Sequence, residues 1–200
     1  MIQLKGKVAL IAGGSGAIGA ASVLLFAEAG AAVITTHRPG KDAEGAAVLG
    51  GLPGAGHLAL PLQIDDGASV DALIDRMFAV VRAFAPMLKA SGDGLIVSIS
   101  FIAAVSGQGS SIAYCAAKAG INVMTKSLAR ALAPAVRVLA VSPGVVSTGL
   151  VPGRGEEFNQ KTASTTPLKR VATAQAVLAC ATHLTFSTGQ TIVVDGGRSL

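Results

Sequence analysis

The residues with the clearest chemical potential in this chain are Tyr114 and Lys118, which lie four positions apart in a run typical of a helix. Positions i and i+4 share one face of an α-helix, so the phenol and the ammonium can point the same way. A nearby cation favours the phenolate and lowers a tyrosine pKa from its usual value of about 10. Such a tyrosine can exchange a proton near neutral pH. The pair alone also fits an ordinary helix with one half-buried Tyr and one surface Lys.

Composition indicates one tightly packed α/β domain. The chain has 200 residues, of which 51% are apolar and 14% are charged, so it is not a disordered chain. That length suits one domain with a sizeable core. Because Trp is absent and aromatic residues make up 4%, the core must consist mainly of Ala, Val, Leu and Ile. Such a core suits parallel strands that helices cover on both faces.

The net charge, the cysteine content and the first residues of the chain limit the binding partners and the cellular location that the sequence predicts. The net charge of +5 comes without a Lys/Arg run, so nucleic-acid binding is not expected, whereas a cleft for an anionic cofactor is. Cys115 and Cys180 form no disulfide framework, which favours a reducing compartment. The first seven residues lack the apolar core of a signal peptide, and no apolar run reaches about 18 residues. We expect a cytoplasmic protein with no membrane partner and no metal site.

A glycine-rich turn joins the first predicted strand, Val8–Ile11, to a helix over about 20–29. This strand–turn–helix order is typical of a dinucleotide-binding βαβ unit. Glycines let the backbone approach a pyrophosphate, and the start of the helix offers free N–H groups to it. An ordinary βα turn is the alternative.

The end of the second predicted strand, 31–36, carries His37 and Arg38 where the adenosine ribose of a cofactor would lie. A carboxylate at this point would accept hydrogen bonds from the ribose hydroxyls and repel a 2′-phosphate. The chain has none here, and the guanidinium of Arg38 can instead bind a phosphate. We therefore expect NADP(H) to be favoured over NAD(H); a solvated loop Arg is the alternative.

The remaining pattern alternates strands and helices without repeats. It predicts an α/β fold with a doubly wound parallel sheet, a three-layer α/β/α Rossmann domain spanning residues 1–200. Pro61 suggests an edge position for the third strand. The polar stretch 153–166 is interpreted as a substrate lid. Further strands are predicted at 58–64, 95–99, 136–141 and 191–194, and helices at 41–49, from about 66, from 114 to 132 and at 174–184.

In this order and spacing the motifs resemble the short-chain dehydrogenase/reductase family over nearly the whole chain. The glycine turn resembles the family's Gly-x-x-x-Gly-x-Gly, with Ala17 in place of the middle glycine. Tyr114 and Lys118 match the proton donor and its partner. The stretch 143–148, Pro-Gly-Val-Val-Ser-Thr, resembles the segment that holds the nicotinamide carboxamide, and 189–197 resembles the C-terminal signature. The overall look is similar to ketoreductases of the 3-oxoacyl carrier-protein reductase type.

The resemblance implies hydride transfer between a nicotinamide cofactor and a small-molecule carbonyl or secondary alcohol. Tyr114 would protonate the carbonyl oxygen, Lys118 would bind the nicotinamide ribose, and a serine, here Ser100, would hydrogen-bond the same oxygen. The resemblance also implies a homodimer or homotetramer formed through the Tyr114 helix, which is rich in small residues. The implied cofactor contacts are Gly13, Ser15, Ala17, Ile18, Gly19, His37, Arg38, Gln63, Ile64, Tyr114, Lys118, Pro143, Gly144, Val146 and Thr148.

Three departures from the family pattern bear on this hypothesis. The catalytic serine usually lies thirteen residues before the tyrosine, where this chain has Phe101, so Ser100 must serve after a local shift or the role is empty. Gln63 stands in place of the adenine-contacting Asp. The fourth strand, with its Asn-Asn-Ala-Gly turn, and the Asn of the next helix have no counterpart.

The missing strand has a structural consequence, because strand four lies beside strand one in the order 3-2-1-4-5-6. Without it, Val8–Ile11 would keep unpaired backbone groups, which are rare when buried. Either the 95–99 strand pairs directly with strand one, or residues are missing between about 75 and 81. We favour the second explanation, which predicts a break in the Cα spacing there. A smaller discontinuity is possible near 172–176.

Two other functions remain open. One is a nucleotide-binding pseudo-enzyme with the same fold, which Phe101 and the missing Asn favour and the intact Tyr114–Lys118 pair opposes. Cofactor binding without carbonyl-dependent NADPH oxidation would identify it. The other is a Rossmann-like transferase, which would not need this pair.

Overall fold

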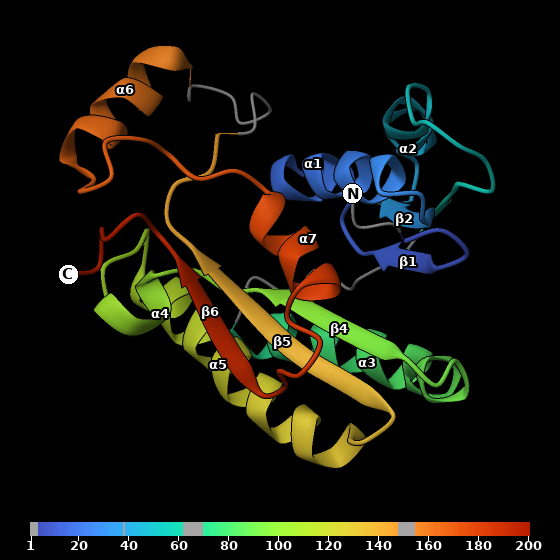
Figure 1. Cartoon of the computed structure of the whole chain (residues 1–200). Helices are drawn as coiled ribbons and strands as arrows, with labels where there is room; N and C mark the ends of the chain where they lie inside the picture. Colours follow the sequence, from blue (N-terminus) through green and yellow to red (C-terminus); the bar gives the residue numbers. More distant parts are fainter. Residues whose placement is uncertain (1–3, 38, 62–69, 148–154) are drawn as a thin grey trace. The chain divides into compact units, whose positions relative to one another are not determined.

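The computed structural model describes residues 4–37, 39–61, 70–147 and 155–200 (Figure 1). The chain divides into two compact units, which we describe separately. The first unit comprises 1–64, 146–159 and 173–183, and the second comprises 65–145, 160–172 and 184–200. The strands of both units pair in parallel, as the sequence predicts.

The first unit contains a three-stranded parallel sheet in the order β1-β2-β3. β1 pairs with β2 from Val8 opposite Ala32, and β2 pairs with β3 from Ile34 opposite Leu58. Pro61 ends β3 at the edge of the sheet, which confirms the position predicted for it. The elements are β1 (Val8–Ile11), α1 (Ala17–Glu28), β2 (Ala32–His37), α2 (Asp42–Leu49), β3 (Leu58–Pro61) and α7 (Gln175–Thr182).

Small and branched apolar side chains form the core of the first unit, between α1 and the sheet. Val23 of α1 and Val33 of β2 are fully buried. Phe26 and Ala27 complete the inner face of α1, and partly buried side chains of α7 pack against the same cluster. Val33 of β2 thus packs against the inner face of α1 and holds that helix on the sheet.

The second unit contains a parallel sheet in the order β4-β5-β6. β4 and β5 pair from Gly94 opposite Val136 to Ile99 opposite Val141, and β5 pairs with β6 from Leu139 opposite Gln190. The long helix α5 connects β4 to β5 and packs on β5 and α3. The elements are α3 (Val70–Ala90), β4 (Gly94–Ile99), α4 (Ala103–Ser106), α5 (Ile112–Leu132), β5 (Val136–Pro143) and β6 (Gln190–Val194). A further helix, α6 (Glu156–Thr165), occupies most of the predicted lid.

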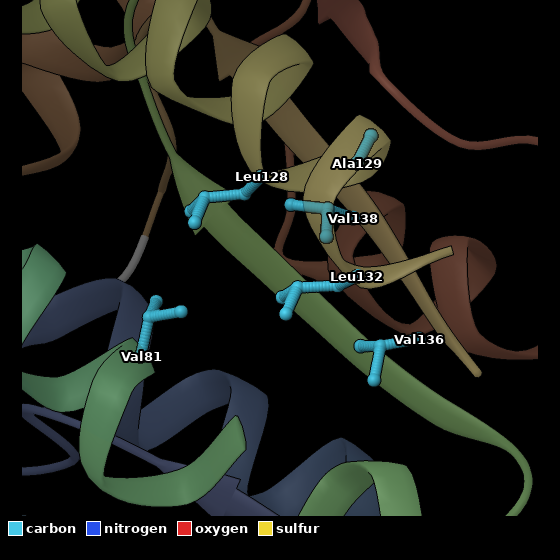
Figure 2. Close-up of a cluster of buried hydrophobic side chains, with 6 residues drawn as sticks. All are labelled: Val81, Leu128, Ala129, Leu132, Val136 and Val138. Atoms are coloured by element: carbon cyan, nitrogen blue, oxygen red, sulfur yellow. The ribbon is translucent and has the colours of Figure 1, made fainter. Parts of the chain in front are cut away.

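The core of the second unit lies where α3 and α5 meet β5. Figure 2 shows Val81 of α3 with Leu128 and Leu132 of α5, beside Val136 and Val138 of β5. These side chains are at most 8% exposed. Burying each one contributes roughly 1.5–3 kcal/mol relative to leaving it in water. This cluster fixes α5, and with it Tyr114 and Lys118, relative to the carboxyl end of β4.

The structure corrects the prediction of a break at 75–81. Helix α3 runs without interruption from Val70 to Ala90, so its Cα spacing is regular there. The alternative is not seen either, because the strand pairs of the described residues give β1 one neighbour, β2, and give β4 one neighbour, β5. The short helix α4 was not predicted, since four residues carry no usable periodicity.

Candidate active site

The glycine turn after β1 folds back on itself at the start of α1. Gly13 has a positive φ of 74°, and its N–H donates to Thr36 Oγ1 at 3.0 Å. A side chain on Gly19 would collide with the backbone of Gly13 and Gly14, so this glycine is required for the close approach. A side chain on Gly14 would collide with Thr35. The loop therefore needs glycine for steric reasons that are visible in the structure.

The start of α1 is suited to an anion. Its first residue is preceded by Gly16, whose missing side chain makes no cap, and the first turn contains no acidic residue. Backbone N–H groups at a helix start carry partial positive charge. Ser15 is exposed beside them. This geometry fits the pyrophosphate of a dinucleotide.

His37 lies at the end of β2, as predicted, but its side chain is only 6% exposed. The ring packs against α2, where a side chain on Gly45 would collide with it, and Nε2 lies 4.0 Å from a carboxylate oxygen of Asp42. His37 is thus a packing residue between β2 and α2 in this structure. A phosphate contact at this position would depend on Arg38, which lies outside the described residues.

Helix α5 begins at Ile112 with Ser111 as its cap. The hydroxyl of Ser111 accepts the N–H of Tyr114 at 3.0 Å, a bond that stabilises a helix start by about 1 kcal/mol. Ala117 and Ile121 form part of its buried face. The predicted helix thus has a defined start immediately before the tyrosine.

The tyrosine and lysine side chains lie together, as the i, i+4 spacing predicts. Lys118 Nζ is 5.7 Å from the centroid of the Tyr114 ring. The same Nζ donates to the carbonyl oxygen of Ile99 at 2.8 Å, which ties α5 to the end of β4. Burial lowers the pKa of Lys118 from its ordinary value of 10.5. Lys118 thus places its ammonium group over the Tyr114 ring.

Ser100 is placed differently from the predicted role. Its side chain is 1% exposed, and its hydroxyl donates to the carbonyl oxygen of Lys118 at 3.1 Å. Its backbone N–H donates to Val141 at 2.8 Å. The O–H group is thus used inside the protein, between β4 and α5. Direct contact of Ser100 with a substrate stays a prediction that would need a rearrangement.

Phe101, the residue that stands in place of the family's serine, lies beside Tyr114. The two ring centroids are 5.9 Å apart and the ring planes meet at 68°, an edge-to-face contact. The neighbouring N–H of Ile102 donates to the carbonyl of Pro143, so the segment after β4 is attached to the end of β5. The side chain beside the Tyr114 ring is thus the aromatic ring of Phe101, at the position where the family pattern has a serine hydroxyl.

The end of β5 and the residues after β6 are held together by backbone contacts. The N–H of Gly144 donates to Val194 at 3.1 Å, and a side chain on Gly144 would press on Asp195. Asp195 accepts hydrogen bonds from the N–H groups of Gly197 and Ser199. Burial acts to raise the pKa of Asp195, but these hydrogen bonds outweigh it and the pKa is lowered. The predicted motifs at 143–144 and 194–197 are therefore packed together.

Some predicted contacts cannot be placed. Gln63, Ile64 and Thr148 lie outside the described residues, as does Arg38. Ile18 is in the first turn of α1, and Val146 follows the turn after β5; both are half-buried. Two residues were missed by sequence reasoning: Thr35 Oγ1 donates to the carbonyl of Ile11, and Thr36 accepts from Gly13. The sequence feature that could have indicated both residues is the pair of threonines near the end of the strand that pairs with β1, which leads into the glycine turn.

Comparison with known proteins identifies the family. Residues 76–199 match the profile of the family described as Enoyl-(Acyl carrier protein) reductase, adh_short_C2. The chain is 41% identical over 127 residues to the short-chain dehydrogenase/reductase homolog YusR of Bacillus subtilis, covering 62% of this chain and 98% of that protein. It is 33% identical over 242 positions to the cis-4-hydroxycyclohexanecarboxylate dehydrogenase of Sinomonas cyclohexanicum, covering 96% of each chain. The chain belongs to the short-chain dehydrogenase/reductase family.

Two further proteins are similar to this chain over nearly its whole length. The 3-oxoacyl-[acyl-carrier-protein] reductase FabG of Thermotoga maritima is 30% identical over 244 positions, covering 98% of this chain and 99% of that one. A solved NADPH-bound short-chain oxidoreductase from Pseudomonas aeruginosa PAO1, which contains an atypical catalytic center, superposes with a TM-score of 0.84 at 28% identity and 98% coverage of both chains.

These similarities confirm the resemblance to FabG-type reductases and the α/β Rossmann fold. Family membership makes the protein an oxidoreductase that uses NAD(P)(H). Its substrates are small molecules, as in the rest of the family. Within the described ranges no helix is both long and apolar enough to cross a bilayer.

Proposed function

We propose that the protein interconverts a carbonyl compound and a secondary alcohol with NADP(H), and that Tyr114 is its proton donor. The observation that carries the proposal is the Lys118 ammonium, which is fixed 5.7 Å from the Tyr114 ring by its bond to Ile99. A phenol beside a fixed cation can release and recover a proton at neutral pH.

The glycine loop supports nucleotide binding. Its backbone approaches closely at Gly19, and the uncapped start of α1 provides N–H groups for a pyrophosphate. The bound nicotinamide would supply or accept the hydride at the substrate carbon. Lys118 would bind the nicotinamide ribose, and the turn at Pro143 and Gly144 would hold the carboxamide. The NADPH-bound structural neighbour with its atypical catalytic center supports NADP(H) and shows that the family includes departures from the usual site.

The proton step on this chain is simple. As hydride reaches the carbonyl carbon, the oxygen gains negative charge and takes the proton from the Tyr114 hydroxyl. The resulting phenolate is stabilised by the Lys118 cation, and solvent then restores the proton. The reverse sequence oxidises the alcohol.

We further propose a cytoplasmic homodimer or homotetramer built on α5, whose exposed Val123 and Ile112 lie outside the core. Sedimentation at micromolar concentration tests the assembly.

Substitution of Tyr114 tests the function directly. We expect Tyr114→Phe to lower kcat by about 100-fold or more, since general acids contribute roughly 10²–10⁴. NADPH binding, followed by its fluorescence, should be unchanged because only the hydroxyl is removed. Cys115→Ala, at the next position, is the matched control and should keep its activity. A Tyr114→Phe protein that keeps most of its turnover would show that Tyr114 is not the acid.

A pseudo-enzyme remains the second candidate, because Phe101 replaces the serine and Ser100 uses its hydroxyl internally. Under this alternative the wild-type protein would bind NADPH and oxidise none of it over a broad panel of ketones. Measurable ketone-dependent oxidation that Tyr114→Phe abolishes would exclude it.

A further inference from the structure

The surroundings of Tyr114 contain an aromatic ring where a second hydroxyl is expected. Phe101 meets the Tyr114 ring edge-on, with centroids 5.9 Å apart. Phe101 is only half-buried. A benzene ring cannot donate a hydrogen bond to a substrate oxygen, but it can pack against an apolar or aromatic group.

The neighbouring serine does not compensate for this loss. Ser100 is 1% exposed, and its O–H bonds to the carbonyl oxygen of Lys118. Lys118 in turn donates its Nζ to Ile99, so the two contacts lock the end of β4 to α5. Turning the Ser100 hydroxyl toward a substrate would break this hydrogen bond between β4 and α5. Ser100 therefore acts here as a positioning residue for Lys118.

We propose that Phe101 determines specificity at this site: the substrate oxygen is hydrogen-bonded by Tyr114 alone, and the ring of Phe101 receives an apolar, preferably aromatic, group on the carbonyl carbon. The preferred substrates are then aryl ketones and the corresponding secondary alcohols. The inference rests on the proposed function, because it uses Tyr114 as the contact to the reacting oxygen.

Tyr114 offers a probe of binding that needs no turnover. It is the one tyrosine in the sequence, so ¹³C-labelled tyrosine gives a single ring signal by NMR. Benzamide and acetamide carry carbonyls that hydride does not reduce under these conditions, and they differ in the aromatic group. With NADP⁺ present, benzamide should shift the Tyr114 signal at a lower concentration than acetamide.

The Phe101 variants give the decisive comparison. Edge-to-face packing is worth about 0.5–1.5 kcal/mol, so Phe101→Ala and Phe101→Leu should weaken benzamide binding roughly two- to tenfold while leaving acetamide unchanged. Phe101→Leu keeps an apolar side chain and guards against loss of folding. Ser110→Ala, an exposed serine near the start of α5, is the control and should change neither affinity. Equal binding of both amides, or benzamide affinity that ignores position 101, overturns the proposal.

Kinetics then separate the inference from the proposed function. Acetophenone and 2-octanone have the same number of carbons, and the wild type should favour acetophenone in kcat/KM, a preference that Phe101→Ala removes. Phe101→Ser should have a kcat for 2-octanone at least about tenfold above that of Phe101→Ala, since one donor to a developing oxyanion is worth roughly 10²–10³. If the protein reduces ketones but substitutions of Phe101 do not change its preference between acetophenone and 2-octanone, the proposed function stands and the inference is refuted. Phe101-dependent benzamide binding without any ketone reduction would refute the proposed function and leave standing the role of Phe101 in binding an aromatic group.

Discussion

Lys118 Nζ donates a hydrogen bond to the carbonyl oxygen of Ile99 at 2.8 Å, although the two residues lie nineteen positions apart in the chain. The bond fixes an ammonium group beside the Tyr114 ring and holds it out of water. Burial lowers the pKa of Lys118 below 10.5, so the charged form is less favourable in the folded protein than in the unfolded chain. The folded protein therefore holds the proposed partner of Tyr114 at some cost in stability.

This cost predicts a pH dependence of stability. Between the folded pKa of Lys118 and 10.5, the unfolded chain binds more protons than the folded protein, so the free energy of unfolding should rise with pH in that window. Lys118→Met lacks this contribution and should lose turnover. Urea unfolding from pH 7 to 10.5 measures the difference between the two proteins. The exposed Lys126, on the same helix, provides the control Lys126→Met. Parallel stability profiles for wild type and Lys118→Met would contradict the prediction.

Ser100→Ala distinguishes a positioning role from a catalytic one. The Ser100 hydroxyl donates to the Lys118 carbonyl, so its loss should lower the free energy of unfolding by about 0.5–1.5 kcal/mol. We expect KM and kcat to change only a few-fold. If Ser100 instead donates to the substrate oxygen, kcat should fall by roughly 10²–10³ with little loss of stability. Denaturation and steady-state kinetics on one preparation decide between these outcomes.

The sequence predicted most elements because short apolar runs, glycine turns and helix-like runs are local signals. The strands at 8–11 and 95–99, and the helix that carries Tyr114, follow from such signals. The use of the Ser100 hydroxyl was not predictable, since its partner is a backbone carbonyl eighteen residues away. The same holds for Thr36, whose contact to Gly13 exists only once β1 and β2 are paired.

Arg38 should set the cofactor preference. No acidic residue directly follows β2 in the sequence, and a lost charge-assisted contact costs about 1.5–3 kcal/mol. Arg38→Ala should therefore weaken NADPH roughly tenfold or more and hardly affect NADH. The exposed Arg130 gives a control, Arg130→Ala, that should change neither. Calorimetric titration with both cofactors measures this, and equal weakening of NADPH and NADH would refute the assignment to the 2′-phosphate.

The aligned relatives are longer than this chain. The alignment with the Sinomonas dehydrogenase spans 242 positions, whereas this chain has 200 residues, so at least 42 positions have no counterpart here. That alignment covers 96% of both chains, so most of the difference is internal. Between β3 and β4 the described residues contain one helix, α3, and the family match begins inside it at residue 76. We infer that one strand–helix unit of roughly this size is absent between β3 and the start of this match.

Restoring that unit should therefore improve the protein. We expect that the corresponding segment of the Sinomonas dehydrogenase, inserted between Pro61 and Arg76, adds a strand that pairs with β1 on the side away from β2. The melting temperature should rise by several degrees, because about 1 kcal/mol shifts it by roughly 2–4 °C in a domain of this size. NADPH affinity should increase if the added unit completes the nucleotide-binding sheet. A Gly/Ser insert of equal length is the control and should produce neither gain, because a flexible loop cannot add a strand. If the grafted and Gly/Ser proteins have the same melting temperature and bind NADPH equally, the inferred missing unit does not stabilise the sheet.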